Sequence, residues 1–515
     1  MHRFHRIQLK RISSLAAGIP RSLFHLRVQT RAFNAHHDTF SLRLASRNYL
    51  RTRKLLLMFY DTGSVLVIFG MFIAVVLLVW TMVSLLSSTF LRLTAPDTST
   101  SLLKRAVEVA TRATTYSSVA HVVNPIIPGL TVPLKHLPLI LLSLCISQIV
   151  HECGHAITAA IHRIPMLAAG ASITLMFPAA FVMLPSARVE ELSSLDRLRV
   201  ITSGCFHNLT LWLILLAAAW SGIGQRILLV GYEDVFARGL IVAHIETDSP
   251  LSMHLPVGSF LTALDDLPLN SSRDAWSTYL LEPAPAAYKQ GWCVDASRLS
   301  GEHSTCCCMD TDNSASSSSC FVSFESKMEE YCTDPVAILS KMQNRCDSSI
   351  SCLESQSCIK PRGDLDILRI TVNHEGADTE DEHIVLWSGP RYEVWEQVQT
   401  THLAPRFGII PLGLPLIFTD FFQYLKLTNL SLYLLNSLPL PALDGSQLLI
   451  ILLEMVFTGW FHTPSTIIDI EALRTRGSRP YERRVQQVLR TFVMIGTCTL
   501  LGSCIILGIT EWMIV

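Results

Sequence analysis

The chain has 515 residues, of which 50% are apolar and only 16% are charged, and its mean hydropathy is +0.37. This composition excludes a disordered chain and is typical of a protein that spans a membrane. The net charge of -1 excludes a broadly basic surface, so we expect no direct binding of nucleic acid.

Positive charge gathers at the N-terminus. Residues 1–54 hold twelve Lys or Arg residues against a single acid, Asp38. Because basic residues next to a membrane span stay in the cytosol, we interpret residues 1–61 as a basic cytosolic segment. An Arg-rich, acid-poor start is also typical of an organelle transit peptide, and this reading is the alternative.

Five apolar stretches are long enough to cross a bilayer core of about 30 Å as helices. They cover residues 62–86, 137–161, 200–220, 430–457 and 488–509. The apolar stretch 164–185 contains Pro165, Gly170, Pro178 and Pro185, which break a helix. We therefore expect a re-entrant hairpin there, between the second and third spans.

Counting spans from a cytosolic N-terminus places residues 221–429 in the lumen, and the Arg-rich loops 188–199 and 474–484 in the cytosol. Nine of the fourteen cysteines lie between Cys293 and Cys358, inside the lumenal stretch. Disulfides persist in such oxidising compartments, so we expect most of these cysteines to pair. A structural zinc is a weaker reading of the cluster, because C-x-x-C pairs are missing. The sequon Asn270-Ser271-Ser272 predicts a glycan on the same side.

The lumenal stretch 231–405 has the strand and turn pattern of a PDZ-like domain. A β-branched strand begins at Gly239, and in such domains this first strand offers a free edge to a peptide. A β-rich domain without peptide binding is the alternative. The polar, Cys-rich insertion 293–358 interrupts the domain, and strands at 365–372 and 383–387 are expected to resume its sheet.

The second span contains ionisable residues that can bind a metal or transfer a proton. It contains His151-Glu152-Cys153-Gly154-His155, an H-E-x-x-H arrangement. Two histidines at i and i+4 share one helix face and can bind one metal ion, with the glutamate beside a bound water. Ionisable groups in a bilayer helix are costly unless they face a cation or a polar cavity. Polar residues that only join helices are the alternative reading.

A catalytic zinc needs a third protein ligand. Asp444 follows a Pro-broken sequence in the fourth span and is the only acid between Asp420 and Glu454, so it is the preferred candidate. It can instead be a helix cap. His162 and His207 are the other candidates for the ligand.

Taken together, these motifs resemble the intramembrane metalloproteases of the site-2 protease family, and its eukaryotic members in particular. The resemblance rests on HECGH, on Leu443-Asp444-Gly445 with Asn436 and Pro439 ahead of it, on residues 177–182, and on Gly204 to Asn208. It implies a polytopic α-helical membrane protein with a lumenal PDZ-like α+β domain interrupted by a Cys-rich insertion. The expected parts are a basic segment 1–61, a span 62–86, a catalytic core 137–222, the lumenal domain 231–405 and a final membrane region 408–515.

The resemblance further implies Zn²⁺ bound by His151, His155 and Asp444, with Glu152 as general base and later general acid. Asn208 and Asn436 are candidates for holding the substrate strand or the oxyanion, although hydrogen bonding between helices is an equally good reading of each.

The implied substrates are membrane-anchored transcription factor precursors with a transmembrane helix, such as sterol-regulatory-element-binding precursors, after a first lumenal cut. The implied location is the Golgi or endoplasmic reticulum membrane. A catalytically silent adaptor that binds partners through its lumenal domain is the alternative function. A zinc transporter is a third reading, and it predicts polar residues along a path instead of at one point.

Overall fold

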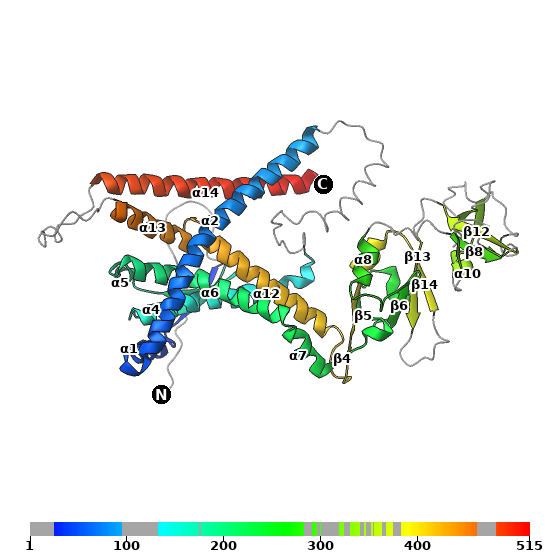
Figure 1. Cartoon of the computed structure of the whole chain (residues 1–515), viewed down its shortest axis with the longest axis horizontal. Coiled ribbons are helices and arrows are strands. Elements are labelled where there is room, and N and C mark those ends of the chain that lie inside the picture. The colour runs from blue at the N-terminus through cyan, green and yellow to red at the C-terminus, as the bar shows by residue number, and fades with distance from the viewer. Residues whose placement is uncertain are drawn as a thin grey trace, which may run out of the picture. The chain divides into compact units, whose positions relative to one another are not determined.

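A computed structural model describes most of the chain (Figure 1). The described residues are 25–94, 132–174, 177–282, 291–295, 299, 319–323, 330–339, 344–346, 352–353, 355–362, 367–373, 383–460 and 480–514. They form two compact units. One unit contains the described residues up to 222 and from 419 onward, and the other lies within residues 223–418.

Long helices dominate the first unit. Its helices are α1 (Asn34–Ala45), α2 (Leu50–Thr94), α4 (Leu137–Ile161), α5 (Ser186–Glu190), α6 (Ser194–Trp220), most of α12 (Leu414–Ser437), α13 (Asp444–Trp460) and α14 (Pro480–Ile514), with 3₁₀ turns at Arg47–Tyr49 and Leu134–His136. Among the described residues, four helical stretches are long and apolar enough to cross a membrane: 47–90, 134–161, 194–220 and 484–510. Four of the five predicted spans lie within them, and the chain is a polytopic membrane protein.

The fourth predicted span, 430–457, is not one continuous helix. The chain breaks between α12, which ends at Ser437, and α13, which begins at Asp444. Pro439 and Pro441 lack the N–H groups that a continuous helix needs. Ala442 adopts a left-handed backbone with φ of 68°, which turns the chain. The break corrects the prediction and places Asp444 in the first turn of a helix.

The predicted hairpin 164–185 is a pair of β-strands. β2 (Ala168–Thr174) and β3 (Phe177–Met183) are antiparallel, and β1 (His25–Thr30) adds to the other edge of β2. β3 is thus an outer strand of this three-stranded sheet, and Pro178 is tolerated there because an outer strand does not need every N–H.

The N-terminal segment is more structured than its composition predicts. Besides β1, it contributes α1, which packs on α4 through hydrogen bonds from His37 Nε2 to Ala156 O (3.0 Å) and from Ser41 Oγ to Ala160 O (2.9 Å). The helix α2 begins at Leu50, well before the predicted start at residue 62. Residues 25–61 are therefore integral to the membrane unit, and the transit-peptide reading does not describe them.

Small and hydroxyl-bearing residues bring the central helices together. A Cβ at Gly154 of α4 would lie 2.5 Å from Ser203 O of α6, so the two helix backbones touch there. Thr158 and Ser203 hydroxyls meet at 3.0 Å across the same contact. On the other side of α6, the ring of Phe206 fills the space beside Gly63 of α2. Close packing of this kind is how helices associate within a bilayer.

The second unit contains an antiparallel sheet in the order β14-β13-β6-β5-β15, with β7 attached to β6. Its elements are β5 (Leu240–Ile245), β6 (Phe260–Leu264), β7 (Leu267–Pro268), β13 (Ile367–Asn373), β14 (His383–Ser388) and β15 (Val398–Thr401), with helices α7 (Ile223–Gly231), α8 (Ala275–Leu281) and α11 (Arg391–Gln397), 3₁₀ turns at Phe236–Arg238 and Pro250–Met253, and a separate strand pair, β4 (Tyr232–Asp234) with β16 (Leu403–Pro405). Leu261, Leu264, Leu368 and Ile370 are fully buried in its core. As expected, β13 and β14 continue the sheet after the Cys-rich stretch.

The predicted peptide edge on the first strand is not free. β5 pairs with β6 on one side and with β15 on the other. β15 comes from about 150 residues further along the chain, so no local pattern near Gly239 reveals it. The sheet ends instead at β14 and β15, and the expectation of a free β5 edge is wrong.

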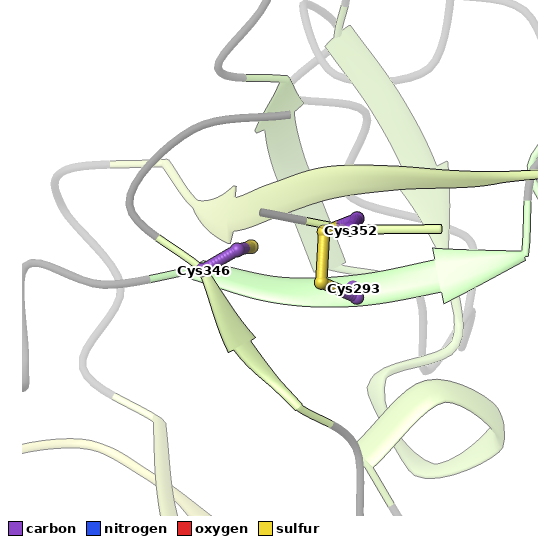
Figure 2. Close-up of side chains that lie close together, drawn as sticks. All are labelled: Cys293, Cys346 and Cys352. Atoms are coloured by element: carbon purple, nitrogen blue, oxygen red, sulfur yellow. A yellow bond between two sulfur atoms is a disulfide. The ribbon is translucent and has the colours of Figure 1, made fainter. Parts of the chain in front are cut away.

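The Cys-rich stretch has its own sheet, in the order β10-β9-β12-β8-β11. Its elements are β8 (Gly291–Asp295), β9 (Ser319–Ser323), β10 (Glu330–Thr333), α10 (Pro335–Leu339), β11 (Arg345–Cys346) and β12 (Gln356–Pro361). Disulfides join Cys293 to Cys352 and Cys346 to Cys358. Figure 2 shows the Cys293–Cys352 bond beside Cys346. These thiols are close enough for a metal, but the two disulfides use all of them. Residues 306–308 of the predicted cluster lie outside the described residues.

These two disulfides lead to a prediction. Replacing both Cys293 and Cys352 with serine should destabilise this sheet by about 3–4 kcal/mol, and replacing Cys346 and Cys358 should cost about 1 kcal/mol less. The first bond spans 59 residues and the second spans 12, so the first restricts the unfolded chain more. Urea-dependent pulse proteolysis of the purified protein measures both losses. Cys498→Ser, at an exposed free cysteine, is the control and should change nothing. Equal stability of all the variants would contradict the disulfide assignment.

Candidate metal centre

The H-E-x-x-H residues lie in the second half of α4, where the helix packs on α6. His151 is buried, and Glu152 and His155 are half-buried. The four-residue spacing puts both imidazoles on one helix face, as the sequence predicts. Their Nε2 atoms are 3.2 Å apart and point to the same place.

Asp444 reaches this place from α13. Its Oδ2 atom lies 3.0 Å from His151 Nε2 and 3.1 Å from His155 Nε2. The three side chains each offer a ligand atom, and these atoms all lie within 4.8 Å of one another. We call His151, His155 and Asp444 the donor cluster. Two imidazole nitrogens and a carboxylate oxygen are a ligand set that suits a divalent transition metal.

The outer nitrogens of both rings are held by α6. His155 Nδ1 lies 2.8 Å from Val200 O, and a carbonyl oxygen only accepts, so Nδ1 carries the proton. In a neutral ring this leaves the Nε2 lone pair free for a metal. The same helix therefore fixes the orientation in which His155 faces the cluster.

His151 Nδ1 lies 3.2 Å from the Asn208 amide nitrogen, and Asn208 is fully buried. The Asn208 Oδ1 atom has no hydrogen-bond partner within the described part of the chain. The two ends of an amide differ little in shape, and turning this amide over lets Oδ1 accept a hydrogen bond from the Nδ1–H of His151. That arrangement satisfies the orphaned oxygen and frees His151 Nε2, so the surroundings fit a bound metal.

Gly204 of α6 makes the space for the cluster. A Cβ at this position would lie 2.4 Å from His155 Nε2 and 2.5 Å from His151 Nε2. Any side chain at residue 204 would therefore collide with the ligand atoms themselves. Cys205, next in the helix, is buried with its Sγ 3.8 Å from Asp444 Oδ2.

Glu152 stands beside the donor cluster and is not one of its members. Its Oε2 atom accepts a hydrogen bond of 2.8 Å from the Val182 N–H of β3. The carboxylate thus joins the catalytic helix to the edge of the β-hairpin.

The other sequence candidates lie outside the donor cluster. His162 sits at the end of α4, with Nδ1 3.6 Å from Asp196 Oδ1. His207 Nε2 lies 2.9 Å from the hydroxyl of Tyr60. Asn436, in the last turn of α12, is half-buried and has no hydrogen bond to a described residue through its side chain. Asn208 lies behind the ring of His151, where it can orient that ring.

Sequence reasoning missed several residues of the site. Tyr60 is 2% exposed and stacks on His207, yet it lies in a segment that was expected to flank the membrane. Val182 contributes only its backbone N–H, so its side-chain type gives no indication of this role. In the sequence, Tyr60 is marked only by its position at the start of an apolar run, and this position does not predict a contact with His207.

The Gly204 contacts lead to a prediction about metal binding. Gly204→Ala should lower metal affinity at least about 10-fold, since the new methyl group displaces both ligand nitrogens. Metal content of the purified protein after dialysis measures the loss. Gly496→Ala in α14, where an added Cβ meets nothing within 4 Å, is the matched control and should keep its metal. Full metal content in Gly204→Ala would contradict the donor cluster.

A second prediction separates the two readings of Asp444. Asp444→Asn should weaken metal binding and cleavage at least about 10-fold, because an anionic ligand is lost. A mere helix cap predicts no change, since Asn caps as well as Asp. Metal analysis and peptide cleavage decide between them. Asp420→Asn, at an acid of α12 outside the donor cluster, serves as the control.

Comparison with known proteins identifies the family. A family model described as Peptidase family M50 matches residues 139–464, more than half of the chain, and this range includes the donor cluster and Glu152. A protein of Arabidopsis thaliana described as a membrane-bound transcription factor site-2 protease homolog is 23% identical over 372 residues, which is 62% of this chain and 71% of that protein. These matches confirm the resemblance noted from the sequence. The chain belongs to peptidase family M50 and is a membrane metalloprotease of that family.

Proposed function

We propose that this protein is a zinc endopeptidase that cleaves peptide bonds within transmembrane segments. The observation that carries the proposal is the convergence of His151, His155 and Asp444, with Glu152 alongside, on helices of the membrane unit. Ionisable side chains are costly in a bilayer, and a cation held between them offsets that cost.

In this proposal the donor cluster holds the metal and Glu152 handles the protons. A zinc ion bound there would supply the Lewis acid that activates a water molecule and polarises a peptide carbonyl. Glu152, next to His151 in the helix, accepts the proton of that water and later delivers it to the leaving amine. Val200 O and Asn208 keep the two imidazoles in the orientation that ligation needs.

The substrate must expose its backbone before it is cut. A transmembrane helix uses its N–H and C=O groups in its own hydrogen bonds, so it has to unwind locally. β3, as an outer strand next to Glu152, offers a place where the freed backbone can pair. Asn436 is half-buried and has a side chain available for holding the substrate.

The proposed substrates are membrane-anchored transcription factor precursors, cut after a first protease has shortened their lumenal part. The Arabidopsis relative, a membrane-bound transcription factor site-2 protease homolog, supports this substrate class. We propose residues 231–405 as a lumenal PDZ-like domain with a Cys-rich insertion, which would exclude bulky lumenal domains from the site. The Cys293–Cys352 and Cys346–Cys358 disulfides and the exposed Asn270 of the sequon are consistent with a lumenal side, and the Golgi or endoplasmic reticulum is the proposed membrane.

The alternative of a silent adaptor leaves the donor cluster unexplained. An adaptor needs neither the carboxylate nor two histidines with their outer nitrogens held in place. A zinc transporter predicts polar ligands spaced along a path, whereas His151, His155 and Asp444 meet at one point. The geometry favours the protease.

Glu152→Gln tests the proposal. This variant should keep its zinc, because the three proposed ligands remain, but lose at least about 100-fold in cleavage, because an amide cannot accept the water's proton. The assay uses purified protein and a transmembrane substrate already trimmed on its lumenal side, with zinc measured in the same samples. Near-normal turnover would eliminate Glu152 as the base, and lost zinc would make it a ligand.

A further inference from the structure

The outer edge of β3 carries a small set of backbone groups. On the inner side, Met183 O accepts a hydrogen bond from Leu167 N–H, next to β2. The neighbouring Val182 N–H points the other way, to Glu152. Successive residues of a strand present their backbone groups to opposite edges, so Val182, Ala180 and Pro178 all face the outer edge.

Only two N–H groups are available on this edge, because Pro178 has none. One belongs to Ala180 and the other to Val182. Both residues are half-buried, and α4 is the neighbouring element on this edge. The structure shows the second N–H in use: Glu152 Oε2 accepts from it at 2.8 Å. The backbone groups at the outer edge of a sheet can pair with another strand. At this edge of β3, the Glu152 carboxylate already accepts from one of them, the Val182 N–H.

We propose that the Val182 N–H is a substrate-binding group, and that the Glu152 carboxylate occupies it until the backbone carbonyl of an extended substrate segment displaces it. The inference rests on the proposed function, and it adds a competition between the base and the substrate for one backbone donor.

The geometry makes this competition unavoidable. A strand that pairs with β3 runs about 4.8 Å from it and directs a carbonyl at each outward N–H. One N–H cannot donate at full strength to both a carbonyl and a carboxylate. Glu152 must therefore swing away when the strand adds, and the link between α4 and β3 opens at the same time.

Displacement has a consequence for selectivity. Glu152 is adjacent in sequence to His151, so a carboxylate released from Val182 stays next to the donor cluster. A segment that remains helical offers no free carbonyl and leaves Glu152 on β3. The base is thus released by an extended segment and held back from an intact transmembrane helix.

Two inactive variants test this directly, since neither cuts the probe. Glu152→Gln keeps a side-chain oxygen that can accept from Val182 N–H, and Glu152→Ala removes it, while both variants lack the negative charge. The probe is a short fluorescent peptide of alternating threonine and valine, and its Kd is measured by anisotropy with the zinc-loaded, full-length protein. Glu152→Ala should bind it about 2- to 10-fold more tightly, the effect of one net hydrogen bond.

A matched pair of proline substitutions locates the effect. Val182→Pro removes the contested N–H, so it should abolish the difference between the Ala and Gln variants. Ala180→Pro removes the other outward N–H, so it should weaken both variants equally and preserve the difference. Pro178 already occupies an outward position of β3, which indicates that the strand tolerates proline there.

Equal Kd values for the Ala and Gln variants would overturn the proposal, and so would a difference that survives Val182→Pro. Affinities that Ala180→Pro leaves unchanged would show that the probe does not pair with β3. If Val182→Pro fails to fold, hydrogen exchange of residues 177–183 replaces it: exchange should be faster in Glu152→Ala than in Glu152→Gln and slow when the probe binds. Because binding is measured without cleavage, these outcomes are separate from loss of protease activity.

Discussion

The close contact of α4 with α6 is the constraint on which the rest of the membrane unit depends. Gly154 lets the backbone of α4 approach Ser203 O of α6, and the hydroxyls of Thr158 and Ser203 close the polar gap beside it. At this short distance Val200 O and Asn208 come within hydrogen-bond reach of the two histidine rings. The helix contact therefore also orients the two histidines of the donor cluster, so helix packing and the geometry of the cluster depend on the same residues.

Glycine at residue 204 follows from the same constraint. If two helices are so close that ring nitrogens of one point at the backbone of the other, the facing residue must lack a side chain. The structure puts both Nε2 atoms within 2.5 Å of where a Cβ would be. On the opposite side, Asp444 completes the cluster because the chain breaks before α13. A continuous helix would have carried that carboxylate elsewhere around its axis.

In the proposed function, the β-hairpin links the donor cluster to the substrate. It is built from a Pro- and Gly-containing stretch that cannot form a helix, and β1 from the N-terminal segment covers one of its edges. The opposite edge of the hairpin is the outer edge of β3. Among the described strands of this sheet, it is this edge that lies beside α4. Glu152 contacts it. In the proposed function, substrate pairing and proton transfer therefore meet at this one carboxylate.

The sequence by itself determined the parts whose signal is local. Apolar length predicts four of the membrane helices, and the spacing of His151 and His155 puts them on one helix face. The breaking residues of 164–185 predict a hairpin, and Asp444 stands out as an acid in an apolar stretch. The chemistry of these residues is readable because bilayer helices tolerate few ionisable groups.

Only the tertiary structure decided what depends on residues far apart in the chain. It ordered the N-terminal segment by pairing β1 with β2, and it closed the expected edge of β5 with β15. It placed the Asn208 amide beside His151, and it brought the Val182 N–H to Glu152. Backbone donors and distant strand pairings leave little mark on residue type, because almost every residue except proline supplies the same backbone groups. For this reason the candidate metal ligands could be picked out from the sequence, whereas the groups that orient and restrain them could not.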